Sequence, residues 1–277
     1  MSDKPAADKK SILDLASIIG IVVGILAILV GQSLEGGHVG SILQPTAAFI
    51  VLGGTFGACL LQYKMSVVFV SLKAIVKVFW DPKANNREVI REIIRLAYKA
   101  RKEGVIALEK DVEQIEDRFL KRALTMAMDG IEPKVLRDTM ELEIANIEDE
   151  AEKPIKFWQS AGGYSPTIGI LAAVLGLINV MEHLTDPSRI GSGIAVAFVA
   201  TVYGVGLANL IYLPISGKLK MKVQLQLITK EIMLVGVIGI LEGENPRLIE
   251  DKLRSYLTPS EQEEAQKKDE SAQKKAA

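Results

Sequence analysis

The 277-residue chain has very few of the side chains that build disulfides and metal sites, with one cysteine and two histidines. The single cysteine, Cys59, excludes an intramolecular disulfide. His38 and His183 lie far apart in the sequence, so we expect no metal site and no other cofactor. Neither sign of charge is in excess, because 33 basic residues stand against 34 acidic ones. A nucleic-acid partner is therefore not expected, since its binding would need a basic surface.

Charge is missing altogether from four long apolar runs. Each run approaches the roughly 20 residues that a helix needs to cross about 30 Å of hydrocarbon. Because backbone groups in hydrocarbon must bond within their own segment, each run is predicted to be a helix. The runs cover residues 15–31, 44–61, 165–181 and 190–213. The sequence thus predicts an all-α membrane protein in contact with lipid, with four transmembrane helices that hold no acid of their own.

Lysines mark one side of the predicted membrane. They precede the first and third spans and follow the second and fourth. The loops 32–43 and 182–189, in contrast, contain a single Lys or Arg residue, which is Arg189. Basic residues favour the cytoplasmic side, so both termini and the long middle segment are expected there, with the chain in a bacterial inner membrane. The predicted parts are a cytoplasmic N-terminal tail (1–11), transmembrane helices 1 and 2 (12–63), a cytoplasmic helical domain (64–163), transmembrane helices 3 and 4 (164–215), cytoplasmic C-terminal helices (216–258) and a disordered tail (259–277).

The middle segment has the period of amphipathic helices. Residues 87–103 place apolar side chains on one stripe and charges outside it. A second helix is expected over 106–129 and a third from Pro133, which suits a first helical turn. The residues 161–166 are expected to break the chain before the third span. The ten apolar residues 232–241 are too few for a fifth span and predict a buried or interfacial helix.

Small residues form stripes in three of the spans, and such stripes let membrane helices approach closely. In the first span the stripe predicts tight helix packing. In the third and fourth spans the two smooth faces, with the hydroxyl of Thr201, are also compatible with a path against a partner helix. Pro166 and Pro214 lie at the ends of these two spans, where prolines are common. The first stripe is Gly20, Gly24, Ala27 and Gly31; the others include Gly169, Ala173 and Gly176, and Gly193, Ala197 and Gly204.

Several motifs resemble the MotA/PomA flagellar stator family. They are LEGGHVGSILQPTAAFIVLGGTFGA, LAYKARKEGVIALEKDVE, SPTIGILAAVLGLINVM and GIAVAFVATVYGVGLANLIYLP, and they occur in the family's order along residues 12–258. Within the family the chain is most similar to the alternative-stator branch of the MotC type.

The resemblance implies a ring of five copies around two copies of a MotB-type partner. The partner's transmembrane aspartate would carry the ion, a plug on the partner would close unassembled channels, and the ring would push on the rotor protein FliG. Thr201 matches the threonine near that aspartate. Pro166 and Pro214 match prolines that couple protonation to conformational change, and Arg101 and Glu109 match the charged pair that engages the rotor.

One difference from sodium-driven members concerns the ion. Those members carry a threonine where this chain has Ala173, and often another where it has Ala200. A sodium ion needs several oxygen ligands in place of its water, whereas a proton needs only a titrating acid and an acceptor. Ala173 therefore predicts a proton-driven type.

Two other functions remain open from the sequence. An ExbB/TolQ-type proton-channel subunit, which energises outer-membrane processes, shares the small-residue spans without acid. That type has its long loop after the first of three spans, whereas two spans precede the loop here. A non-conducting membrane scaffold would tolerate large substitutions at Thr201 and Pro166. No nucleophile–base set or phosphate-binding loop is found, so we do not expect an enzyme.

Overall fold

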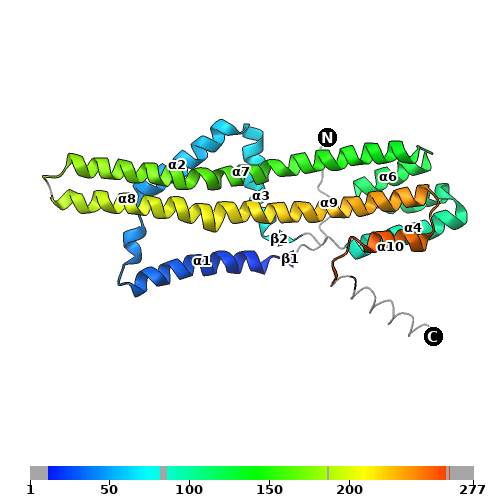
Figure 1. Cartoon of the computed structure of the whole chain (residues 1–277), viewed down its shortest axis with the longest axis horizontal. Helices are drawn as coiled ribbons and strands as arrows, with labels where there is room; N and C mark the ends of the chain where they lie inside the picture. The colour runs from blue at the N-terminus through cyan, green and yellow to red at the C-terminus, as the bar shows by residue number, and fades with distance from the viewer. Residues whose placement is uncertain (1–11, 82–85, 186, 260–261, 263–277) are drawn as a thin grey trace. The chain divides into compact units, whose positions relative to one another are not determined.

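The computed structural model describes residues 12–81, 86–185, 187–259 and 262 (Figure 1). The predicted N-terminal tail and nearly all of the predicted disordered tail lie outside these residues. The chain divides into two compact units. We call residues 11–82 and 151–222 the apolar unit, and residues 1–10, 83–150 and 223–277 the charged unit.

The first half of the apolar unit contains three helices and a short 3₁₀ turn. The Asp14 side chain caps α1 by accepting from the Ser17 N–H, and Pro45 occupies the first turn of α2, where a missing N–H has no cost. The helices are α1 (Leu15–Leu34), η1 (Val39–Ile42), α2 (Pro45–Gln62) and α3 (Met65–Val78).

Helix α3 was not predicted from the sequence. It buries Val68, Ser71, Ala74 and Val78, which recur at helical spacing on one face. The indole Nε1 of the buried Trp158 donates to the Ser71 carbonyl oxygen at 3.0 Å. The helix is therefore amphipathic and packs within the apolar unit.

Two very long helical runs complete the membrane-type segments. Helix α7 (Pro133–Glu182) continues without a break, and α8 (Pro187–Leu207) joins α9 (Leu213–Leu241) through a π-helical turn, η3 (Ala208–Tyr212). Figure 1 shows α7 and α8 side by side. The prediction of a break at residues 161–166 is wrong, because α7 continues through these residues. Gly162 within it packs closely against the Leu213 side chain.

Four of the described helices are long and apolar enough to span a membrane. They lie in Leu15–Leu34, Pro45–Gln62, Pro133–Glu182 and Gly193–Leu241, which confirms the four predicted spans. Residues 232–241 form the end of α9 and are largely buried in the charged unit, as expected for a buried helix.

The only strands among the described residues are two residues long. Strand β1 (Ile12–Leu13) pairs antiparallel with β2 (Trp80–Asp81), and the Asp14 N–H donates to the Phe79 carbonyl oxygen at 2.9 Å. The all-α prediction is confirmed apart from this short pair.

The charged unit is built from short amphipathic helices packed on the ends of α7 and α9. The single helix predicted over 106–129 is wrong, because the chain forms η2, α5 and α6 instead. Asp117 starts α6 as its N-cap, because its side chain accepts from the N–H groups of Phe119 and Leu120. The elements are α4 (Asn86–Glu103), η2 (Val105–Leu108), α5 (Glu109–Gln114), α6 (Arg118–Met128) and α10 (Pro246–Arg254).

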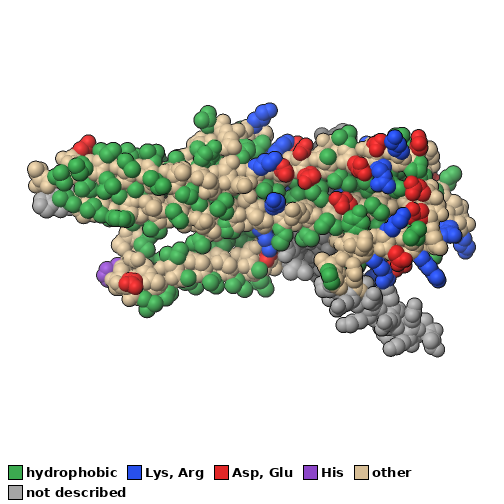
Figure 2. Space-filling view, viewed as in Figure 1, with side chains coloured by type: hydrophobic (Ala, Val, Ile, Leu, Met, Phe, Trp, Pro, Cys, Tyr) green, Lys and Arg blue, Asp and Glu red, His purple; other side chains and the backbone are tan. Residues whose placement is uncertain are grey.

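A hydrophobic core holds the charged unit together. Ile93, Leu96, Leu124, Met140 and Ile232 are fully buried in it. Burying one such side chain stabilises a fold by about 1.5–3 kcal/mol before entropy is counted. Figure 2 shows Lys, Arg, Asp and Glu side chains gathered over the charged unit, whereas the side chains seen on α1 and α8 are mainly hydrophobic.

Candidate functional site

Helices α7 and α8 touch backbone to backbone through their small residues. A Cβ added to Gly204 would lie 2.6 Å from the Ser165 carbonyl oxygen, and one added to Gly169 would lie 2.9 Å from the Ala200 oxygen. Gly176 faces Ala197 at 3.0 Å in the same way. The two small-residue faces therefore pack against each other. This is the close packing that small residues allow, because glycine has no Cβ to keep the two backbones apart, while a path against a partner helix stays a prediction.

Thr201 lies at the edge of this contact and is half-buried. Its hydroxyl Oγ1 donates to the Ala197 carbonyl oxygen at 3.3 Å, one turn back along α8. The neighbouring Ala200 is fully buried with Ala172 in a small apolar cluster. Ala173 of α7 is half-buried, and it brings no polar atom of its side chain to the site. The chain thus offers a single hydroxyl, already bonded to its own helix, at this level of α8.

Pro166 and Pro214 both lie inside continuous helix and not at helix ends. Pro166 is a half-buried interior residue of α7, whereas Pro214 is exposed and lies two residues after the end of the π-helical turn η3. A proline has no N–H to donate, and its ring clashes with the carbonyl four residues before it. For Pro214 this is the carbonyl of Leu210. The π-helical turn ends just before Pro214 and accommodates this clash within an unbroken helix.

Helix α1 packs loosely within the chain. None of its residues is buried, and an added Cβ at Gly20 or Gly31 would meet nothing within 4 Å. Only Gly24 has a near neighbour, the Leu210 side chain at 3.2 Å. A cavity of about 250 Å³ lies between α1, α8 and η3. The tight packing predicted for the first stripe is therefore met at Gly24 and not at the other two glycines within this chain.

Three polar residues of the spans were missed by sequence reasoning. The buried Ser165 hydroxyl donates to the Gly204 carbonyl oxygen at 2.9 Å. The Tyr203 hydroxyl donates to the Ile42 carbonyl oxygen at 2.6 Å and accepts from the Gln44 N–H at 3.2 Å, which fixes the start of α2 on α8. Asn209 is exposed in η3. A polar side chain within an apolar run was the signal that could have found all three.

Arg101 and Glu109 lie on the exposed surface of the charged unit. Arg101 is in the last turn of α4 and Glu109 is the first residue of α5, with Gly104 (φ 88°) turning the chain between them. Within the part of the chain that the structure describes, neither the Arg101 nor the Glu109 side chain forms an ion pair. Both charges are therefore presented to the surroundings.

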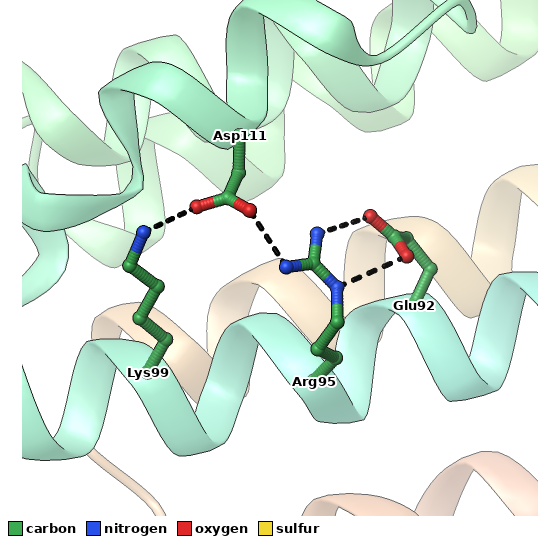
Figure 3. Close-up of polar contacts among 4 residues, drawn as sticks. All are labelled: Glu92, Arg95, Lys99 and Asp111. Carbon is green, nitrogen blue, oxygen red and sulfur yellow. Dashed lines mark hydrogen bonds and ion pairs between the residues drawn. The ribbon is translucent and has the colours of Figure 1, made fainter.

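Next to this pair, other charges bond to one another (Figure 3). The Asp111 carboxylate accepts from Lys99 Nζ and from Arg95 Nη1, each at 2.6 Å. Arg95 also donates to Glu92 at 2.7 Å. Lys99 and Arg95 lower the pKa of Asp111, while Glu92 and Asp111 raise the pKa of Arg95. This network fixes α5 on α4, and its members satisfy one another.

No group of three or more potential metal ligands occurs among the described residues. The apolar runs also hold no Asp, Glu, Lys, Arg or His. A site on this chain can therefore contribute hydroxyl, amide and backbone oxygen to a passing ion, but no titrating carboxylate.

Two family models match the chain. The model of the MotA/TolQ/ExbB proton channel family matches residues 111–232, and that of the motility protein A N-terminal region matches residues 18–104. Motility protein A of Helicobacter pylori is 35% identical over 254 residues, covering 92% of this chain and 99% of that protein.

Two solved structures have the same fold. The C. jejuni MotAB structure matches with a TM-score of 0.85 and 31% identity, covering 89% of this chain and 97% of that one. The flagellar MotAB stator complex from Bacillus subtilis matches with a TM-score of 0.84 and 33% identity, covering 91% and 99%.

Proposed function

Because this chain belongs to the motility protein A family of proton-channel proteins, we propose that it forms an ion channel with a MotB-type partner and converts ion flow into torque on the flagellar rotor. As a stator subunit it is a membrane protein of a proton channel family, and we propose no catalytic role for it. The assignment to the MotC-type branch remains part of the proposal.

The observation that carries this proposal is the combination of four apolar spans without an acid and a half-buried Thr201 at the edge of the α7–α8 contact. A proton or a cation crossing hydrocarbon needs a carboxylate or several oxygens close to its path. Since this chain supplies one hydroxyl there, the carboxylate belongs to the partner. Pro166 interrupts the hydrogen-bond ladder of α7 and Pro214 that of α9, which continues α8, and both prolines are proposed to allow these helices to bend.

We further propose that five copies surround two copies of the partner, with both termini in the cytoplasm of a bacterium and the chain in its inner membrane. In this arrangement the segments 12–63 and 164–215 lie in the membrane, and the segments 64–163 and 216–258 lie in the cytoplasm. Co-purification with the MotB-type partner, followed by imaging of the complex, tests the copy number. A complex of another copy number, or no complex at all, would contradict the proposal.

The ion is proposed to be a proton, because Ala173 leaves only the Thr201 hydroxyl beside the partner's carboxylate. Swimming is measured while external sodium is varied and, separately, while the proton gradient is collapsed. We expect swimming to stop only in the second case. Strict sodium dependence would contradict the assignment.

Rotor contact is assigned to Arg101 and Glu109 because both charges are exposed and neither belongs to the network around Asp111. Charges at the rim of an interface steer association and favour the correct partner. We expect Arg101→Glu to weaken motility and a charge swap on FliG to restore part of it. Normal swimming of a variant that carries both Arg101→Glu and Glu109→Lys would count against this surface.

An ExbB/TolQ-type role is the second candidate, since the matching proton channel family includes those proteins. Two spans precede the charged segment here, however, and the B. subtilis stator chain is matched over 99% of its length. A neighbouring gene for a single-span protein with a peptidoglycan-binding domain supports the stator. A neighbour without that domain would favour the other role.

A further inference from the structure

Asn209 is a polar side chain on the exposed side of a membrane-type helix. It lies in η3, within the apolar run that continues from α8. Its side-chain Nδ2 donates to the Val205 carbonyl oxygen at 2.9 Å. No described residue donates to its side-chain oxygen Oδ1, which therefore remains available as an acceptor.

An available amide oxygen on this face has a physical consequence. Polar side chains are costly in hydrocarbon, so those found in spans face a protein partner or water and not lipid tails. The exposed side of α8 around Asn209 is otherwise apolar, with Phe198 70% exposed and Val205 46% exposed. Asn209 therefore indicates that this side of the helix is covered by something that can donate a hydrogen bond.

The π-helical turn sets Asn209 at the point where the backbone ladder is disturbed. Turns of this kind occur frequently at functional sites. Pro214 follows the turn and removes a donor from the ladder, and the Asn209 amide bonds back to the carbonyl of Val205. The backbone around Asn209 is thus stabilised by its own side chain, which holds Oδ1 in a defined position.

Asn209 lies further along the same helix than Thr201, on the side toward Pro214. At about 1.5 Å per residue the two are separated by roughly 12 Å along the axis. The Pro214 end is the one proposed to face the cytoplasm. A proton that moves toward the cytoplasm between α8 and the partner would therefore reach the level of Thr201 first and that of Asn209 afterwards.

We infer that Asn209 is a second polar residue of the ion pathway, where its Oδ1 accepts a hydrogen bond from the water that carries the proton toward the cytoplasm. This inference rests on the proposed function. It assigns to Asn209 the exit side of the pathway, while Thr201 stands beside the partner's carboxylate. No bond is made or broken at the amide, which serves only as an acceptor for water.

The test is proton uptake into cells that co-express the chain with a plug-deleted MotB-type partner, followed with a cytoplasmic pH-sensitive fluorophore. Asn209→Leu, which fills similar space without an acceptor, is expected to lower uptake about tenfold, as for the loss of one hydrogen bond in the pathway. Asn209→Ser, which keeps an oxygen, is expected to retain most of it. Co-purification with the partner is measured for each variant.

Asn179→Leu is the control, because Asn179 is an exposed amide near the end of α7, beside the loop 182–189 and away from the cytoplasmic exit side assigned to Asn209, and it should have little effect on uptake. Unchanged uptake in Asn209→Leu would overturn the inference. If Asn209→Leu does not assemble, Asn209→Ser is compared with Asn209→Ala. Equal uptake in those two small variants would assign Asn209 to assembly alone and also overturn it.

The same assay separates this inference from the proposed function. If the unaltered complex takes up no protons, or if Thr201→Val conducts normally, the channel assignment itself fails. If Thr201→Val lowers uptake and Asn209→Leu does not, only the role of Asn209 is wrong.

Discussion

The carboxylate of Asp14 pairs with the ammonium of Lys218 and so ties the start of α1 to α9. Asp14 is 6% exposed, and it also accepts from the Ser17 hydroxyl at 2.8 Å. The bond from Lys218 is the main cause that lowers the pKa of Asp14 to about 2. Because α1 buries no residue of its own, this pair and the β1–β2 ladder are central to how the helix is attached.

Replacement of Asp14 by Asn is expected to lower the free energy of unfolding by about 2 kcal/mol at pH 7, since Lys218 loses its partner. The pKa of Asp14 is about 2 in the folded chain and 3.8 without interactions. The stabilisation is therefore complete above pH 5 and declines as the pH falls toward 2, with about half lost by pH 3. Unfolding of both proteins in detergent at pH 7 and pH 3 measures the difference.

Asp251→Asn is the control for this measurement, because Asp251 is an exposed acid of α10. It should change the stability little at either pH. An Asp14→Asn protein as stable as the unaltered chain at pH 7 would show that the pair does not hold α1.

Asp111→Asn is expected to loosen the attachment of α5 to α4 by about 1–2 kcal/mol. Asp111 is 14% exposed and holds both Lys99 and Arg95, but Arg95 is half exposed, so its share is screened by water. Faster amide hydrogen exchange in residues 105–114 is the expected observation. Glu109→Gln, in the same helix but outside the network, should leave exchange unchanged. Equal exchange in the two variants would contradict the role of Asp111.

The sequence predicted the spans well because absence of charge over a long run has one physical solution in a membrane. It failed where tertiary contacts decide. The glycines at 162 and 163 suggested a break, yet α7 continues because Leu213 packs on Gly162. Asp117, read as a residue inside one long helix, accepts from the first N–H groups of α6 and starts a new one.

The candidate site could be predicted only in part. The small-residue stripes and the hydroxyl of Thr201 follow from composition and spacing, and the role of Thr201 from the family resemblance, but spacing does not say which neighbour a stripe contacts. Gly169 and Gly204 face each other, and this depends on how α7 and α8 are paired. The exposure of Asn209 depends on the same packing, so no local pattern reveals it.

Thr55→Val is expected to leave the stability unchanged or raise it by about 1 kcal/mol. The Thr55 side chain in α2 is fully buried, and its hydroxyl has no hydrogen-bond partner among the described residues. An unsatisfied buried polar group lowers stability, and valine has nearly the same shape. Thermal unfolding in detergent measures the effect. Ser165→Ala is the contrasting variant, because Ser165 is equally buried but bonded to Gly204, and its loss should lower the midpoint.

Gly204→Ala is expected to disrupt the α7–α8 contact. The added methyl group would lie 2.6 Å from the Ser165 carbonyl oxygen and 3.0 Å from the Cα of Gly169. Both neighbours are backbone atoms that cannot turn aside, so the helices must separate, at a cost of about 1–3 kcal/mol or more. Gly206→Ala is the matched control, since an added Cβ there meets nothing within 4 Å.

The two alanine variants differ only in position along one helix, so helix propensity affects both alike. Swimming and co-purification with the MotB-type partner are therefore expected to fall in Gly204→Ala and to persist in Gly206→Ala. Normal swimming in Gly204→Ala would mean that α7 and α8 need not touch in the working complex. Loss in both variants would instead place Gly206, which lines the cavity between α1, α8 and η3, against the partner or a neighbouring copy.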